Sequence, residues 1–310
     1  SINPIISLKS SFFFIRFGIF SILIYYLLNT NKNFIKYFSL SLFITFFVVL
    51  LDTYFQYFLG YNILGMQSPQ PGRLSSFFGE ELIVGSFLSR LFPLIMALGI
   101  LMYERGIKYL NIFCIIFLVL TDVIVFLSGE RTSFGLLVIT NIFYIVYISR
   151  YKVFRIFAFV TSLVIITIFL MNDNILKKRM IEQTNLDLTT KMNIDEDGLV
   201  LFSHIHESHY LTALNMFYDK SLFGVGPNMF RFECSNEKYA KGKFSCTTHP
   251  HNTHIQLLAE IGIIGYIIFL IPIIFLAIFF IGKLINLRNK NLLIDDYKTC
   301  LLIAIFLTLF

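Results

Sequence analysis

Charged residues are scarce in this chain of 310 residues: Asp, Glu, Lys and Arg together make up 14% of it, whereas hydrophobic residues make up 56%. The mean hydropathy is +0.75. The chain also has no internal repeat and no low-complexity tract. A composition this apolar excludes an ordinary soluble domain. It predicts an all-α, polytopic integral membrane protein whose solvent is the lipid bilayer.

Eight apolar runs approach the ~20 residues that a membrane helix needs. They predict seven spans and the start of an eighth, at roughly 11–29, 37–60, 81–102, 109–127, 133–149, 156–171, 256–282 and from 299 onward. No cleavable signal peptide is visible, because the first run is long enough to be a span itself. The chain begins with Ser1 and stops inside an apolar run, so we expect a single membrane domain over 1–310 within a longer protein.

Lysine and arginine gather in alternate connections between these runs. The connections at 30–36, 103–108, 150–155 and 283–298 are rich in both residues, whereas the short connections on the other side hold only Arg73 and Arg131. The positive-inside rule makes the rich connections cytoplasmic. We therefore interpret the net charge of +6 as a determinant of the chain's orientation in the membrane and not as a sign of nucleic-acid binding.

The remaining connection, at 172–255, is long and lies on the extracytoplasmic side together with all six histidines. A loop of this length is expected to fold in part, and Ser203 is placed to cap a helix in which Leu211, Leu214 and Phe217 recur at helical spacing. Cys234 and Cys246 both lie in this loop. An oxidising compartment favours a disulfide between them, and two unrelated thiols are the alternative.

The segment from His249 to His254 brings three histidines to the start of the seventh apolar run. Pro250 suits the first turn of a helix, and Asn252 or Thr253 can cap it, so a helix is predicted to begin here. The N–H groups of that helix end favour anions, which makes this rim a candidate reactive site.

Three motifs carry a resemblance to a known family. His251-Asn252, followed after nine residues by Gly262-x-x-Gly265, resembles the signature of bacterial O-antigen ligases and the related O-antigen polymerases. The Gly224-Val225-Gly226-Pro227 turn is similar to a turn that precedes the histidine in that family. Ser128-Gly129-Glu130-Arg131-Thr132 is similar to its small-residue-plus-arginine motif. The resemblance covers roughly residues 70–282.

The resemblance implies a membrane glycosyltransferase that moves a glycan from undecaprenyl diphosphate to a hydroxyl of lipid A core. The site would face the periplasm from the bacterial inner membrane, and neither a cofactor nor a metal is implied. An O-antigen polymerase, which joins lipid-linked repeat units, is the closest alternative. A flippase or transporter for the same lipids is a further one, but it would need charges in both halves of the membrane.

Within this function, His251 is expected to act as the general base or to orient the acceptor, and Asn252 to hold the local turn. Arg131 and Arg73 lie at outer helix ends and are expected to bind the donor diphosphate, because a guanidinium binds phosphate through two parallel hydrogen bonds. The alternative is that both arginines only reach lipid phosphates.

Two further candidates for substrate binding are charged residues in apolar runs. Arg90 shares one depth with Asp52 and Asp122, so it either contacts the ligand or pairs with one of these carboxylates to hold helices together. Glu260, in the first turns of the seventh span, pairs with an arginine of the same face or stays near the interface.

Two histidine triplets of equal spacing, at 204–209 and 249–254, also invite a zinc interpretation. No cysteine spacing or carboxylate at the usual interval completes such a site, so the sequence favours a polar loop surface for most of these histidines.

Overall fold

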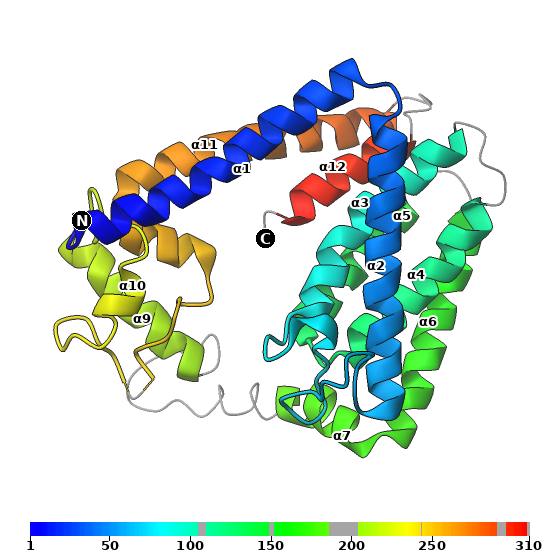
Figure 1. The fold of residues 1–310 in the computed structure, drawn as a ribbon, viewed down its shortest axis with the longest axis horizontal. Helices are drawn as coiled ribbons and strands as arrows, with labels where there is room; N and C mark the ends of the chain where they lie inside the picture. The colour runs from blue at the N-terminus through cyan, green and yellow to red at the C-terminus, as the bar shows by residue number, and fades with distance from the viewer. Residues whose placement is uncertain (105–109, 149–151, 186–203, 243, 290–295, 309–310) are drawn as a thin grey trace. The chain divides into compact units, whose positions relative to one another are not determined.

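The computed structural model describes residues 1–104, 110–148, 152–185, 204–242, 244–289 and 296–308 (Figure 1). These residues form helices and connecting loops, with one isolated bridge between Tyr61 and Gln67. The all-helical prediction is confirmed. Contacts group the chain into two compact units: the first comprises Ser1–Asn31 and Asn185–Leu276, and the second comprises Lys32–Thr184 and Ala277–Phe310.

Several of the described helices have the length and composition to cross a membrane. Five qualify fully: α1 (Pro4–Thr30), α2 (Phe34–Leu59), α3 (Val84–Glu104), α6 (Lys152–Asn172) and α11 (Thr253–Asn289). The apolar helices α4 (Leu110–Leu127), α5 (Arg131–Tyr147) and α12 (Asp296–Thr308) have shorter described apolar stretches. The chain is therefore a membrane-embedded protein. The count of seven to eight spans and the loop boundaries at 172–255 stay predictions.

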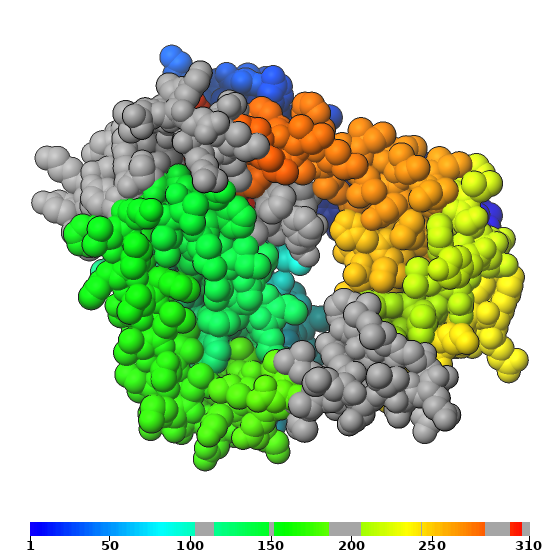
Figure 2. All heavy atoms as spheres, turned by 180° about the vertical axis from the view of Figure 1, so that it is seen from behind, coloured from blue at the N-terminus to red at the C-terminus, as the bar shows by residue number. Residues whose placement is uncertain are grey.

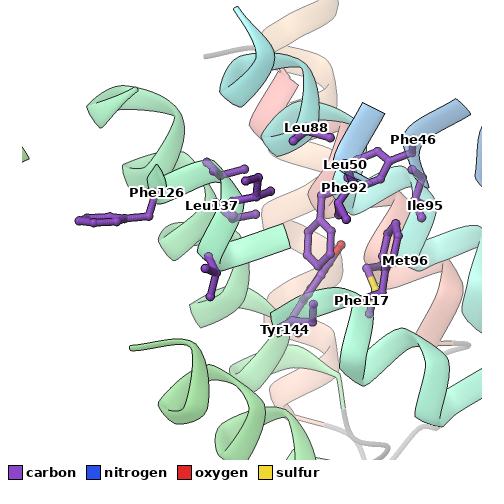
Figure 3. Close-up of a cluster of buried hydrophobic side chains, with 14 of the residues drawn as sticks. Phe46, Leu50, Leu88, Phe92, Ile95, Met96, Phe117, Phe126, Leu137 and Tyr144 are labelled. Carbon is purple, nitrogen blue, oxygen red and sulfur yellow. The ribbon is translucent and has the colours of Figure 1, made fainter. Parts of the chain in front are cut away.

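The second unit is a helical bundle in which α3 packs against α2, α4, α5 and α12. Figure 3 shows the centre of its core, where Leu88 and Phe92 of α3, Phe117 of α4, and Leu137 and Tyr144 of α5 are buried. Helix α6, green in Figure 2, lies at the surface of this unit and exposes a row of large apolar side chains. That surface suits contact with lipid.

The loop that follows α2 is fixed to the end of that helix by three buried polar side chains. Asp52 accepts hydrogen bonds from the Ile63 N–H and the Ser76 hydroxyl, and Gln56 accepts them from the N–H groups of Ser75 and Ser76. Asn62 donates to the Ser76 carbonyl at 2.8 Å. Asp52 therefore serves the fold of this loop, where sequence reasoning weighed it as a partner of Arg90.

Asp122 has a different partner as well. The Asn141 amide of α5 donates to the buried Asp122 carboxyl of α4 at 2.8 Å. Arg90 is exposed on α3, and among the described residues it forms no ion pair with either carboxylate. The expected charge pairing between helices is thus replaced by a neutral amide contact, which avoids burying a full ion pair.

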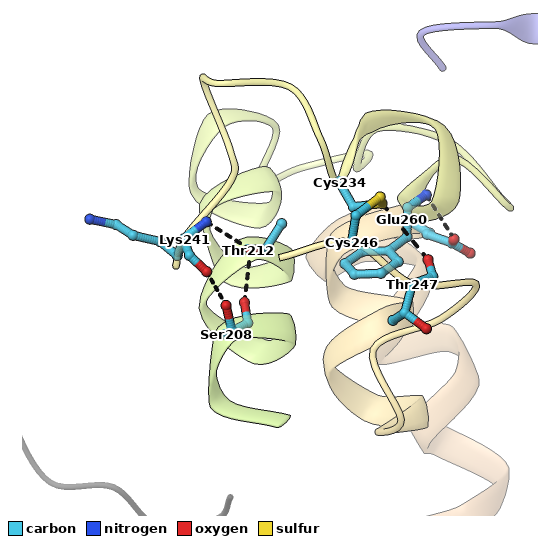
Figure 4. Close-up of a disulfide and its surroundings, with 8 residues drawn as sticks. Ser208, Thr212, Cys234, Lys241, Cys246, Thr247 and Glu260 are labelled. Atoms are coloured by element: carbon cyan, nitrogen blue, oxygen red, sulfur yellow. Dashed lines mark hydrogen bonds between the residues drawn. A yellow bond between two sulfur atoms is a disulfide. The ribbon is translucent and has the colours of Figure 1, made fainter. Parts of the chain in front are cut away.

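The first unit contains α1, α9 (His204–Asp219), the single turn α10 (Phe230–Glu233) and the first part of α11. Its small core holds Ala213, Met216, Phe230 and Ala259. A disulfide joins Cys234 to Cys246, and Figure 4 shows it beside Thr247 and Glu260. The loop after α10 runs along α9 through a set of side-chain hydrogen bonds made by Ser208, Thr212, Asn215, Asp219, Lys238 and Tyr239.

Helix α11 is interrupted at Gly262, whose φ of 66° and ψ of −175° are not helical. In a continuous helix, Ile263 and Ile264 would donate to the carbonyls of Ala259 and Glu260. Instead they donate to the carbonyls of Ser221 and Leu222, at 2.8 and 3.3 Å.

The two carbonyls that the break releases find partners in the same loop. The Val225 and Gly226 N–H groups donate to Ala259 and Glu260, each at 2.9 Å. The 221–226 segment therefore fills the break, and four backbone groups that would be costly to leave unpaired in a membrane protein are satisfied.

Glycine is required on both sides of this exchange because the two backbones nearly touch. A Cβ at Gly262 would lie 2.4 Å from the Leu222 carbonyl oxygen, and a Cβ at Gly224 would lie 2.4 Å from the Glu260 carbonyl carbon. The glycines of two motifs that lie far apart in the sequence thus meet at one point of the structure.

We predict that Gly262→Ala destabilises the protein, because its backbone conformation is nearly exclusive to glycine and costs another residue on the order of 1–3 kcal/mol even before the steric clash. Gly282→Ala is the matched control in the same helix, since no atom lies within 4 Å of the added methyl group. Thermal unfolding of both purified variants should show a lower Tm for Gly262→Ala alone. Equal Tm values would contradict the role of the break.

Candidate functional site

The segment from Ser128 to Thr132 forms a tight turn between α4 and α5. The Glu130 carboxylate accepts hydrogen bonds from the Gly85 and Ser86 N–H groups at the start of α3, at 2.7 and 3.0 Å, and from the Ser133 hydroxyl. A carboxylate at this position satisfies N–H groups that have no partner within the helix. The turn is thereby fixed to α3, and Arg131 begins α5 beside it.

Arg73, Arg131 and Arg179, the arginine cluster, gather at this turn from three separate segments. Arg179, in the π-helical turn η2 (Lys178–Glu182), donates to the Gly129 carbonyl at 3.0 Å. Arg73 donates to the Leu82 carbonyl at 2.8 Å, and Arg131 donates to the Thr184 hydroxyl at 3.1 Å. In each of these three contacts the acceptor is a neutral oxygen.

The three cations of the cluster repel one another. Partial burial lowers the pKa of Arg73, and repulsion from Arg131 adds to that effect, whereas Glu130 opposes it. Burial likewise lowers the pKa of Arg179, with further repulsion from Arg73 and Arg131. The nearby Glu130 carboxylate is already hydrogen-bonded to the start of α3. An anion would relieve this repulsion.

Arg73 also lines a cavity of about 370 Å³. Polar residues of the 67–73 loop form one side of it, and Gln56, Tyr57 and Asp173 form another. The Nε atom of Arg73 is buried, and it has no hydrogen-bond partner among the described residues. A buried donor of this kind is expected to find an acceptor.

Sequence reasoning proposed two of these arginines and missed the third. Arg73 and Arg131 do come together, as members of the same cluster. Arg179 ends the basic run Lys177-Lys178-Arg179. Its place directly after the sixth apolar run, at the end that carries the other two arginines, was the available signal. Arg90 lies elsewhere on α3 and is exposed.

His206, His209, His249 and His251 form a second group, the imidazole cluster, in the first unit. The ring of His251 lies 5.2 Å from that of His206, 5.6 Å from that of His209 and 4.4 Å from that of His249, measured between ring centroids. The first two residues come from α9 and the other two from the loop before α11. The two triplets seen in the sequence therefore contribute to one site.

The backbone at His251 is held in an unusual conformation, with a φ of 57°. Such a left-handed value is uncommon for a residue with a side chain and suggests a functional constraint. The adjacent Asn252 accepts a hydrogen bond from the Ile255 N–H at 3.1 Å, so it caps α11. Asn252 thereby fixes the turn that presents His251.

The environment of His251 changes its acidity. Partial burial against the neighbouring rings, followed by repulsion from His249, His206 and His209, lowers its pKa from 6.5 to about 4. Burial and its two neighbours also lower the pKa of His209. An unperturbed imidazole titrates near neutrality. The imidazole of His251 is instead uncharged across the physiological range, so it can accept a proton or a hydrogen bond.

The zinc interpretation finds no geometric support in the part of the chain that the structure describes. No group of three or more His, Cys, Asp or Glu side chains there is arranged to hold a metal ion. The side chain of His204 lies outside the described set.

Glu260 was expected to contact substrate, but its surroundings indicate another role. The side chain is buried, and its carboxylate accepts a hydrogen bond from the Phe230 N–H at 3.2 Å. Its backbone carbonyl takes part in the exchange at the break in α11. We therefore interpret Glu260 as a residue that holds the 224–230 loop in place.

Comparison with known proteins identifies one family. A family model described as O-antigen ligase matches residues 113–270, more than half of the chain. The matched region contains the turn at Arg131, the imidazole cluster and the break in α11. Searches of curated proteins and of solved structures found no match.

We predict that the His251 ring titrates near pH 4 and that the double variant His206→Ala/His209→Ala raises its pKa toward 6.5, because the change removes both burial and repulsion. Nuclear magnetic resonance of histidine labelled in the ring measures this directly. His254→Ala is the control, since His254 bonds to the Tyr266 hydroxyl. A wild-type pKa near 6.5 would contradict the prediction.

The same pKa has a consequence for stability. The unfolded chain binds the His251 proton more readily than the folded protein does. The stability gained from this residue is therefore complete above pH ~6.5 and is lost as the pH falls toward 4.

Proposed function

Because the chain belongs to the O-antigen ligase family, we propose that it transfers a glycan from undecaprenyl diphosphate to a hydroxyl of lipid A core at the periplasmic face of the inner membrane. Family membership supports a glycan-transfer role of the ligase or polymerase type, carried out by a membrane-embedded enzyme. The lipid-linked donor, the bilayer and the acceptor would be its partners.

The arginine cluster carries this proposal. A diphosphate is a good leaving group whose developing negative charge needs stabilisation in the transition state. Arg73, Arg131 and Arg179 supply three permanent positive charges. Arg73 lines a cavity, and its buried Nε has no hydrogen-bond partner among the described residues. The diphosphate would bind among these guanidinium groups, with Arg90 as a further proposed contact.

The reaction itself is a substitution at the first sugar of the donor. The acceptor oxygen forms a bond to the anomeric carbon, while the bond from that carbon to the diphosphate oxygen breaks. The bonding electron pair leaves with the diphosphate, and the acceptor hydroxyl gives up its proton. As in other glycosyl transfers, positive charge develops on the sugar ring before the new bond is complete.

His251 is the proposed acceptor of that proton. A base with a pKa near 4 is weak. However, the proton of the hydroxyl becomes strongly acidic once its oxygen bonds to the anomeric carbon, so a neutral imidazole at the right position is sufficient. The neighbouring imidazoles keep His251 neutral, and Asn252 holds the turn that carries it.

We predict that Arg179→Ala lowers transfer on the order of 10- to 100-fold, the effect of losing a charge-assisted hydrogen bond to phosphate. Arg131→Lys should also lose most activity, because lysine keeps the charge but lacks the planar fork. Lys177→Ala is the matched control, being an exposed cation two residues away. Equal activity of Arg179→Ala and Lys177→Ala in a membrane transfer assay would remove Arg179 from the site.

We predict that His251→Ala lowers transfer by ~10² to 10⁴, the usual contribution of positioned proton transfer, without removing the protein from the membrane. A deletion strain complemented with this variant should accumulate lipid-linked polymer and carry none on lipid A core. Complementation with His254→Ala should restore the polymer. Full activity of His251→Ala would refute the base assignment.

The same strain distinguishes the two members of this class of enzyme. Lipid A core that carries a single repeat unit would identify a polymerase in place of a ligase. Transfer by purified protein in the presence of a chelator would separately exclude a metal-dependent reaction.

A further inference from the structure

The side chains of helix α11 change from buried to exposed at the break at Gly262. Before Gly262, Ala259 and Glu260 are buried in the first unit. After it, the helix (orange in Figure 2) exposes large apolar side chains around its circumference, among them Ile267, Ile268 and Phe275, which is 69% exposed. The 20 residues from 263 to 282 measure ~30 Å along a helix, which matches the hydrocarbon thickness of a bilayer. The apolar layer therefore begins at the break.

Helix α1 independently indicates the same position for the start of the apolar layer. The Ile2 N–H donates to the Val225 carbonyl at 2.7 Å, and the buried Ser7 hydroxyl donates to the Pro227 carbonyl at 3.0 Å. Beyond this attachment, exposed apolar side chains follow along α1 from Leu8 onward. Two lipid-facing helices thus start at one turn, residues 224–227, which must lie close to the membrane surface.

The segment just before that turn exposes three large side chains, Tyr218, Leu222 and Phe223, which we name the apolar edge. Their exposed fractions are 72%, 58% and 71%. The Leu222 carbonyl accepts a hydrogen bond from Ile264, so the edge is attached to the first turn of the lipid-facing part of α11. Lys220 lies between the three. Aromatic residues next to a lysine are typical of the membrane–water interface.

We propose that the apolar edge inserts into the lipid bilayer at the boundary between the lipid headgroups and the acyl chains. Apolar side chains gain free energy there, and the Lys220 ammonium reaches lipid phosphates. This contact rests on the membrane embedding of the chain and is independent of the glycan-transfer chemistry.

Insertion of the edge would set the height of the imidazole cluster above the membrane. His209 precedes Asp219 by ten residues of α9, a distance of ~15 Å along the helix axis. Thr253, which follows His251, precedes Gly262 by nine residues, or ~13 Å along α11. The edge would therefore fix how far an acceptor hydroxyl must extend from the bilayer to meet His251.

The chain contains no tryptophan, so a single introduced tryptophan reports on its own position. Phe223→Trp in lipid nanodiscs should lose much of its fluorescence when the lipids carry bromine near the headgroup end of their acyl chains, and less when the bromine lies deep. Phe275→Trp, in the middle of the α11 span, should show the opposite depth preference.

Phe244→Trp is the matched control for water exposure. Phe244 is 52% exposed, and its loop is attached through Lys241 to Ser208, about three turns of α9 away from Asp219. Its fluorescence should not respond to brominated lipid. Where Phe223→Trp fails to fold, Tyr218→Trp takes its place.

Two results would overturn the proposal. A tryptophan at 223 that emits like one in water and is not quenched would show that the edge is exposed to solvent. A blue-shifted emission that no brominated lipid quenches would show that protein covers it, either a second copy or another chain. Neither result would affect the transfer assays of Arg179→Ala and His251→Ala.

Discussion

The hydrogen-bond exchange between the broken α11 and the 221–226 loop is the contact on which the first unit depends. A break in an apolar helix releases backbone groups that lipid cannot satisfy, and this loop pairs with four of them. The pairing requires contact between backbones, so glycine is needed at 224 and 262. It joins the loop before the histidines to the helix after them, and α1 attaches at the same turn.

The arginine cluster follows from a different constraint in the second unit. Helix α3 begins with unpaired N–H groups, and the Glu130 carboxylate satisfies two of them. That contact fixes the turn from which Arg131 starts, while the Gly129 carbonyl in the same turn accepts the hydrogen bond from Arg179. The described acceptors of Arg73 and Arg179 are backbone carbonyls, and that of Arg131 is the Thr184 hydroxyl.

Close packing of the rings in the imidazole cluster makes two of its histidines harder to protonate. Burial within the cluster, together with repulsion from neighbouring imidazoles, lowers the pKa values of His209 and His251. Under the proposed function, the imidazole cluster would supply the proton acceptor and the arginine cluster would supply the positive charges. Each component is stabilised locally, within its own unit.

The sequence by itself determined the membrane-embedded, all-helical architecture and the family, because hydropathy and short motifs are properties of neighbouring residues. It also singled out Arg73, Arg131, His251 and the cap at Asn252. Only the tertiary structure brought Arg179 to Arg131 and α9's histidines to His251, and it assigned Asp52 and Glu260 to loop anchoring. These contacts join residues that lie tens of positions apart. They depend on how helices pack and where loops fold back, which no local pattern encodes.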